Sequence, residues 1–204
     1  MRRIILILTL LTVLFVSPTA NAEYRWGVGA GVNINSLTFK QDITPVKKNV
    51  GGQANIIGEL MFPGIGFGVD FGLGYNMQGA KVDLGSKEIW SEEYGNENLI
   101  IHSLYIPIHL RFKYTRLDGL EDKIAPMAYF GPEFNIQLGH SKCDAIKFSG
   151  GDLGLTLGVG AELFKRFQIS GAYTWGMTYV LKTKLLQNYS AKSGQWSVRA
   201  AYFF

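Results

Sequence analysis

Two histidine–serine pairs are the residues of this chain best suited to chemistry. His102 precedes Ser103, and His140 precedes Ser141. A histidine base that takes the proton of a serine hydroxyl is the arrangement of many nucleophilic enzymes. Adjacent residues of a strand point to opposite faces, however, so on strands neither histidine would reach the serine next to it. Catalysis would need a contact between two strands. We therefore expect polar residues that anchor strand ends, in a protein that is not an enzyme.

Metal and thiol chemistry have less support. The three histidines, at 102, 109 and 140, lack the spacing of a metal site. Cys143 is the single cysteine, so it cannot form an internal disulfide. Its neighbours His140 and Lys142 are weak indications of a reactive thiol. We predict no metal and no cofactor.

The charge and composition exclude one class of partner and favour one class of fold. The formal net charge is +4, and because Arg2 and Arg3 belong to the leader described next, residues 23–204 carry only +2. The basic residues are scattered, which gives no support for nucleic-acid binding. The 25 glycines and the 13% of aromatic residues suit strands and turns better than helices.

The first 22 residues have the pattern of a Sec-type signal peptide. Arg2-Arg3 precedes an apolar run from Ile4 to Val16, and Ala20-Asn21-Ala22 provides a cleavage site. The apolar run is short for a spanning helix, which needs about 20 residues. We predict a cleaved leader at 1–22 and one domain at 23–204.

The rest of the chain alternates apolar and polar residues with a period of two. No run after residue 22 reaches the roughly 18 apolar residues of a spanning helix, but alternating segments of about ten residues recur. We predict eight strands, at about 24–37, 51–62, 66–78, 99–114, 124–138, 152–163, 166–181 and 195–204. No amphipathic helix is long enough to cover their apolar faces, so lipid is the remaining cover.

The last strand supports a bacterial outer-membrane location. Its apolar face ends on the final residue of the sequence and comprises Trp196, Val198, Ala200, Tyr202 and Phe204. This alternation with a terminal Phe resembles the C-terminal assembly signal of bacterial outer-membrane β-barrels. The resemblance implies that the barrel-assembly machinery is a partner through this strand.

The lengths of the connections predict an orientation. Short turns fall at 63–65, 116–123 and 164–165, and longer connections fall at 38–50, 79–98, 139–151 and 182–194. Outer-membrane barrels keep tight turns in the periplasm and longer loops outside the cell. We therefore predict an all-β fold, an eight-stranded antiparallel up-and-down transmembrane β-barrel with both termini in the periplasm.

The inward faces of these strands carry balanced charges. They are Arg25, Arg111, Lys113 and Arg199 against Glu59, Asp70, Glu133 and Glu162. An eight-stranded barrel has an interior just wide enough for side chains, where charges must be paired or hydrated. We predict that these eight residues form a charge plug. A narrow gated path for ions or small solutes is the alternative.

Outward aromatic residues predict the membrane boundaries. The predicted girdle is Tyr24, Trp26, Tyr75, Tyr114, Tyr173, Trp175, Tyr179 and Tyr202. Such rings lie at the polar boundary of a bilayer, so we expect contact with outer-membrane lipid and lipopolysaccharide. Residues 79–98 contain acidic residues with Trp90 and Tyr94, and Lys40, Lys47 and Lys48 could face lipid phosphates. A surface ligand of these loops is therefore a further expectation, and its identity is unknown.

Four segments carry a resemblance to a known family. Residues 104–114, LYIPIHLRFKY, resemble the "YLEIPLLLKY" strand of the PorT-like, porin-family outer-membrane β-barrel domain of Bacteroidetes. Residues 125–132 are similar to its "PY...GP" strand, 152–160 to its "DFGL..G.G" strand and 173–177 to its "RY..GL" element. The departures are Tyr105, where the family has Glu, and His109, where Leu is typical.

The resemblance implies an outer-membrane barrel and leaves its role open. One relative is linked to secretion of surface proteins, and some eight-stranded barrels modify lipid A with a His and a Ser. We expect a plugged surface or envelope protein with extracellular binding loops. A narrow channel, a lipid A-modifying enzyme and an accessory to protein secretion are the alternatives, because fold does not fix function.

Overall fold

The computed structural model describes residues 23–39, 46–62, 66–83, 96–114, 119–141, 146–183 and 190–204. The predicted leader at 1–22 lies outside the described residues, as do Cys143, Lys40 and the loop aromatics Trp90 and Tyr94. The described elements are β1 (Glu23–Phe39), β2 (Val46–Met61), β3 (Phe67–Asp83), β4 (Asn96–Lys113), the 3-10 helix η1 (Leu120–Asp122), β5 (Ile124–His140), β6 (Ile146–Phe148), β7 (Gly151–Leu163), β8 (Phe167–Thr183) and β9 (Ser190–Phe203).

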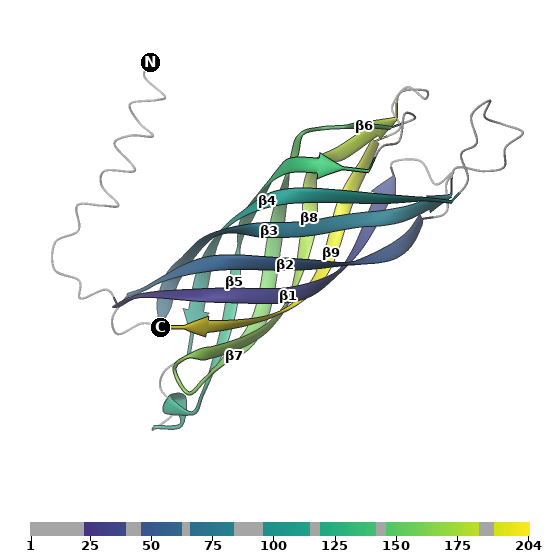
Figure 1. The fold of residues 1–204 in the computed structure, drawn as a ribbon. Helices are drawn as coiled ribbons and strands as arrows, with labels where there is room; N and C mark the ends of the chain where they lie inside the picture. The colour runs from purple at the N-terminus through teal and green to yellow at the C-terminus, as the bar shows by residue number, and fades with distance from the viewer. Residues whose placement is uncertain are drawn as a thin grey trace, which may run out of the picture.

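The strands form a closed antiparallel barrel (Figure 1). Each long strand pairs with the next along the chain, and β9 pairs with both β8 and β1, which closes the wall. The short β6 pairs with β8 beyond the end of the β7–β8 ladder, so β6 and β7 occupy one strand position. The prediction of an eight-stranded barrel is confirmed.

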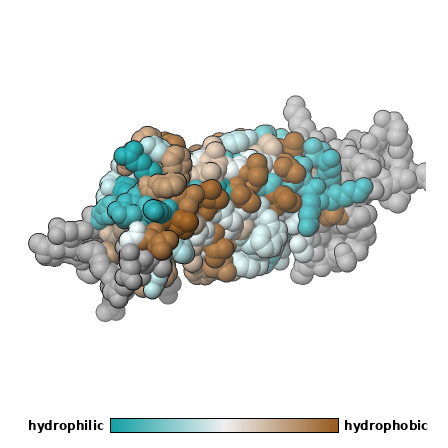
Figure 2. All heavy atoms as spheres, turned by 90° about the horizontal axis from the view of Figure 1, so that it is seen from below, coloured by the Kyte–Doolittle hydropathy of each residue, from teal (hydrophilic) through white to brown (hydrophobic). Residues whose placement is uncertain are grey.

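The wall has an apolar outside and a polar inside. Val32 is 61% exposed on the outer face, whereas the guanidinium-bearing Arg111 is only 1% exposed inside. On the face seen in Figure 2, apolar residues gather over the middle of the barrel, with hydrophilic residues towards both ends. We call this middle part of the outer face the apolar band. A β-barrel that spans a bilayer needs an apolar outer face and backbone hydrogen bonds that are all satisfied between its strands. Among the described residues, no helix is long and apolar enough to cross a membrane.

Several strands extend beyond their predicted ends. β2 begins at Val46, within the expected connection 38–50, and it pairs with β3 at Val46–Val82 and Lys47–Lys81. The register then shifts between Lys48 and Gln53. Residues outside the apolar band still gain backbone hydrogen bonds when their strands pair. Because neither of their faces meets lipid, apolar and polar residues need not alternate there. Period-two reasoning therefore misses these extensions.

The turn between β7 and β8 and the 3-10 helix η1 lie at the end of the barrel where the described chain begins and ends, and β6 lies at the opposite end (Figure 1). Between β7 and β8, Phe164 and Lys165 have positive φ angles of 52° and 59°. Two consecutive residues in this conformation form the two-residue turn that matches strand twist. We call the end with this turn the turn end, and the other the loop end.

Candidate functional site

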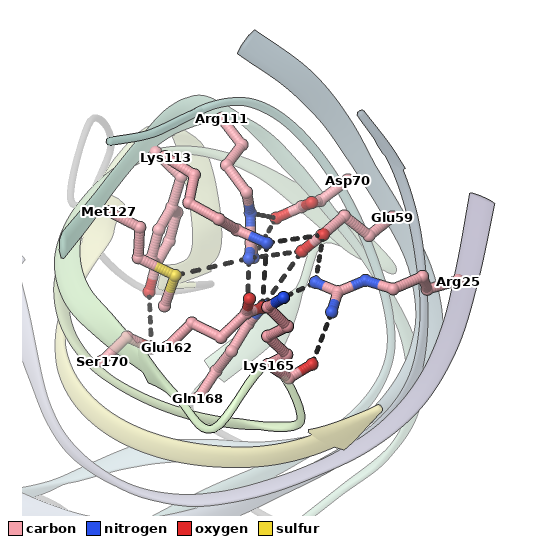
Figure 3. A network of polar contacts seen from close by, with 11 residues as sticks. Arg25, Glu59, Asp70, Arg111, Lys113, Met127, Glu162, Lys165, Gln168 and Ser170 are labelled. Carbon is pink, nitrogen blue, oxygen red and sulfur yellow. Dashed lines mark hydrogen bonds and ion pairs between the residues drawn. The ribbon is translucent and has the colours of Figure 1, made fainter. Parts of the chain in front are cut away.

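The barrel interior is the candidate site, and ion pairs fill its turn-end half. Glu59 of β2 lies at the centre (Figure 3). It pairs with Arg25 of β1, with Arg111 Nη1 at 2.7 Å and with Lys113 Nζ at 2.9 Å, and it is fully buried. Arg111 and Lys113 are two residues apart on β4, so the period of two points both side chains into the lumen.

Arg111 joins both sides of this network. Its Nε donates to Asp70 Oδ2 at 2.7 Å, and its Nη1 donates to Gln168 Oε1 at 2.7 Å as well as to Glu59. Gln168 in turn donates to both Glu59 and Glu162. The planar guanidinium can serve several acceptors in one plane, which a lysine cannot do. Arg111 thus fixes the relative positions of β2, β3, β4 and β8.

Glu162 completes the network from β7. Its Oε2 accepts from Lys113 Nζ at 2.8 Å and from Arg25 Nη2 at 2.6 Å. Arg25 also donates to the Lys165 carbonyl at 2.6 Å and lies 4.9 Å from the centre of the Phe203 ring. The ion network is defined here as Arg25, Arg111 and Lys113 with Glu59, Asp70 and Glu162, three cations and three carboxylates.

The two other predicted plug residues lie in a separate layer above the ion network. Glu133 accepts from the Tyr105 hydroxyl at 3.0 Å, and its Oε1 lies 3.2 Å from His109 Nε2. Arg199 lies 5.3 Å from the centre of the Tyr129 ring, a cation–π contact. Tyr105 and His109 therefore both meet at Glu133.

A layer of amides follows towards the loop end. Asn33 donates to Asn76 at 2.8 Å, and Asn76 donates to Gln195 at 3.2 Å. Asp152 accepts from Gln78 at 3.1 Å and from an asparagine of β5 at 3.2 Å. Sequence reasoning missed this layer, although asparagines at the inward positions 33 and 35 of β1 were a usable signal.

Apolar side chains close the loop end of the lumen. The apolar cap consists of Leu37, Ala80, Leu99, Leu181 and Ala191, with Val46 and Phe148 packed against them. Its first five residues are buried inside the barrel, where most other inward side chains are polar. The interior is therefore occupied by ion pairs, polar groups and then apolar groups along its length.

The His–Ser pairs do not meet within themselves. Ser103 is buried in the lumen, while His102 lies outside, with its Nδ1 2.5 Å from the Tyr75 hydroxyl. Ser141 accepts from the Ile100 N–H at 2.8 Å, so it ties the end of β5 to β4. In the described part of the chain, no group of three or more His, Cys, Asp or Glu residues could hold a metal ion.

The predicted girdle and C-terminal residues all lie on the outer face. Tyr24, Trp26, Tyr114 and Tyr202 are near the turn end, and Tyr75, Tyr173, Trp175 and Tyr179 are nearer the loop end. The C-terminal face, Trp196, Val198, Ala200, Tyr202 and Phe204, also points outwards. Phe204 is 76% exposed, yet its N–H donates to the Trp26 carbonyl at 2.8 Å. The last residue thus extends the seam between β9 and β1.

A closed barrel with an apolar outer wall and a polar, filled interior defines the class of outer-membrane β-barrel proteins. A family model described as "Outer membrane protein beta-barrel domain" matches residues 6–204. The chain belongs to this family and is a bacterial outer-membrane protein.

Several solved outer-membrane proteins are similar to this chain at low sequence identity. Neisserial surface protein A is 14% identical with a TM-score of 0.49, and the match covers 88% of this chain and 97% of that one. A major outer membrane protein from Thermus thermophilus is 16% identical with a TM-score of 0.46, covering 89% and 99%. Ail of Yersinia pestis, solved with the heparin analogue sucrose octasulfate, is 14% identical with a TM-score of 0.44, covering 89% and 99%. A search of curated proteins finds no significant match.

Proposed function

We propose that this protein is a non-conducting barrel of the outer membrane that serves as a surface or envelope component, with its loops as the binding surface. The observation that carries the proposal is the ion network, in which three cations and three carboxylates neutralise one another across the lumen. A permeating ion would have to separate buried partners, which costs several kcal/mol per unpaired charge.

The test is conductance of the refolded protein in planar bilayers. We expect no openings from the wild type. Arg111→Ala leaves the network with one excess negative charge and should admit cations, whereas Glu162→Ala leaves one excess positive charge and should favour anions. Lys123→Ala, which changes an exposed lysine next to η1, is the matched control and should stay silent.

Steady openings of the wild type would make the protein a channel and overturn the proposal. Silence from all variants would also count against the ion network as the barrier and would assign closure to the other two layers. Opposite selectivities of Arg111→Ala and Glu162→Ala are the result that only a charge plug predicts, because each variant removes a charge of a different sign.

The outer face of the barrel is the surface that meets partners, and the role we propose involves no catalysis. We infer that the girdle residues contact outer-membrane lipid and lipopolysaccharide, and that the barrel-assembly machinery binds the outward face of β9. The separation of His102 from Ser103 supports a protein that is not a lipid A-modifying enzyme. The sequence motifs at 104–114 and 152–160 support a PorT-like subfamily, for which an accessory role in secretion is the alternative.

A further inference from the structure

The outer wall is recessed near the loop end. A groove of about 710 Å³ lies between β4, β5, β7 and β8. Its apolar walls include Ile106, Phe134, Ile136 and Leu153. Its polar lining consists of Asn135, Ser149, Asp152 and Thr178, and the Asp152 carboxylate is held by amides of the lumen. Tyr179 lines the side towards β9. The groove therefore combines apolar walls with hydroxyl-bearing side chains on a face that otherwise meets lipid.

The groove exists because the β7–β8 ladder is interrupted there. Regular pairing ends at Gly154–Gly176 and resumes where Phe148 of β6 meets Leu181. Between these points one backbone hydrogen bond remains, from the Ser149 N–H to the Val180 carbonyl at 3.1 Å, and side chains supply further contacts. Thr178 Oγ1 accepts from the Leu153 N–H at 2.8 Å, and the Ser149 hydroxyl lies 2.7 Å from the carbonyl oxygen of residue 179. The Thr178 hydroxyl uses its oxygen in this contact and keeps its own hydrogen for another acceptor.

The groove lies at the loop-end edge of the apolar band, where Tyr179 of the girdle lines it. Leu138, nearer the loop end of β5 than the groove-lining Ile136, is 66% exposed on the outer face. Hydrocarbon therefore borders the recess, and hydrocarbon cannot accept the Thr178 hydrogen bond. An uncompensated polar group in a bilayer is costly, so the molecule that fills this groove must carry both an acyl chain and a hydrogen-bond acceptor.

A cation marks the polar side of the groove. Lys192 of β9 is exposed, it pairs across the strands with Tyr179, and its Nζ lies 5.6 Å from the centre of that ring. No ion pair joins Lys192 to a carboxylate among the described residues. A phosphate that enters next to Tyr179 would neutralise this lysine.

We propose that the groove binds a membrane lipid with an anionic, phosphate-bearing head group. The acyl chain lies along Phe134 and Leu153, an acyl carbonyl accepts from Thr178, and the phosphate lies near Lys192. Because apolar surfaces gain nothing by leaving lipid for an apolar groove, the selectivity comes from the polar contacts rather than from the chain. The inference is independent of whether the lumen conducts.

The experiment is photo-crosslinking in vesicles. The full chain is refolded into phosphatidylcholine vesicles that contain a trace of a lipid probe with a diazirine in its acyl chain. The probe is either phosphatidylglycerol or phosphatidylcholine. Crosslinked peptides are mapped by mass spectrometry. We expect crosslinks to be enriched at 134–136 and 151–153 relative to 157–159, which lies on the same outer face of β7. One basic residue at the surface favours an anionic lipid by about fivefold, so the phosphatidylglycerol probe should be enriched by about that factor.

Two pairs of variants separate the parts of the proposal. Leu153→Trp fills the groove and should abolish the enrichment, while Leu157→Trp adds the same side chain outside it and should leave the enrichment intact. Lys192→Gln should remove the preference for phosphatidylglycerol. Folding of each variant is checked by the heat-dependent mobility of the barrel in gels.

Three outcomes would overturn the inference. Crosslinks spread evenly over the outer face would mean that the groove holds no preferred lipid. Enrichment that survives Leu153→Trp would place the lipid elsewhere. Equal crosslinking by the two probes would refute the preference for an anionic head group, even if the acyl chain still crosslinks within the groove.

Discussion

Replacing Arg111 by Met tests the ion network through stability. Methionine keeps much of the side-chain length but removes the guanidinium that serves Asp70, Glu59 and Gln168. Glu59 retains Arg25 and Lys113, whereas Asp70 loses the cation that pairs with it. Breaking a buried ion pair on one side costs about 3–5 kcal/mol, so we expect the free energy of unfolding to fall by about 4 kcal/mol.

Asp70→Asn should cost less, because Arg111 keeps its bond to Glu59. In the double variant both members of the Arg111–Asp70 pair are neutral, and no charge of that pair is left buried alone. We expect its loss of stability to be smaller than the sum of the two single losses by about 2 kcal/mol, within the range measured for residues in direct contact. The unfolded reference state is the chain in urea solution, where both charges are hydrated.

The assay is reversible urea unfolding of the protein in lipid vesicles, followed by tryptophan fluorescence. The reasoning fails if Arg111→Met costs less than about 1 kcal/mol, because a buried pair broken on one side cannot be that cheap. It also fails if the two single losses add within about 0.5 kcal/mol in the double variant, since additivity is the mark of residues that do not interact.

Three further changes test the wall, the packing and the end of the chain. Gly158→Ala should destabilise the barrel by about 1–3 kcal/mol in the same assay, because the added Cβ meets the Tyr129 ring inside the lumen. Leu157→Arg places a charge on the lipid face and should cost about 2–4 kcal/mol, whereas Phe164→Arg at the exposed β7–β8 turn should cost much less. Deletion of Phe204 removes the last hydrogen bond of the seam and should lower the fraction of folded barrel recovered from outer membranes, measured by gel mobility.

Controls keep these results interpretable. Gly139→Ala should be nearly neutral, because nothing lies within 4 Å of the added Cβ. If Gly158→Ala is equally neutral, the lumen is less tightly packed than its contacts indicate. If Phe164→Arg costs as much as Leu157→Arg, the apolar band extends to the turn end. Normal recovery of the shortened chain would count against the C-terminal assembly signal.

The alternation of side chains was predictable because each barrel strand has one face in lipid. Leu110 and Arg111 illustrate this, since one points to lipid and the other is fully buried inside. The sequence also identified eight inward charges, but it missed Asp152, which is buried in the amide layer. It could not assign their partners, because pairing across a barrel depends on the stagger of the strands rather than on spacing along one of them. Hence Glu59 meets three cations, while Arg199 lies over the Tyr129 ring.

Other features were hidden for different physical reasons. The interruption between β6 and β7 depends on Gly150, whose φ of 79° breaks the strand, and a single glycine in a glycine-rich chain gives no distinct signal. Gln168 is neutral, so the pattern of charges does not reveal it, yet it donates to both Glu59 and Glu162. The apolar cap departs from the rule of polar interiors, and its residues cluster at the loop end of the lumen.

The ion network also constrains the order in which this barrel can assemble. Glu59 on β2 is neutralised by Arg25 on β1 and by two cations on β4, and Glu162 joins them from β7. A hairpin of β2 and β3 that entered the bilayer alone would carry two carboxylates into hydrocarbon without their cations. Insertion strand by strand is therefore disfavoured for this half of the wall. The chain should curl until distant segments meet, and closure and membrane entry should occur as one cooperative event.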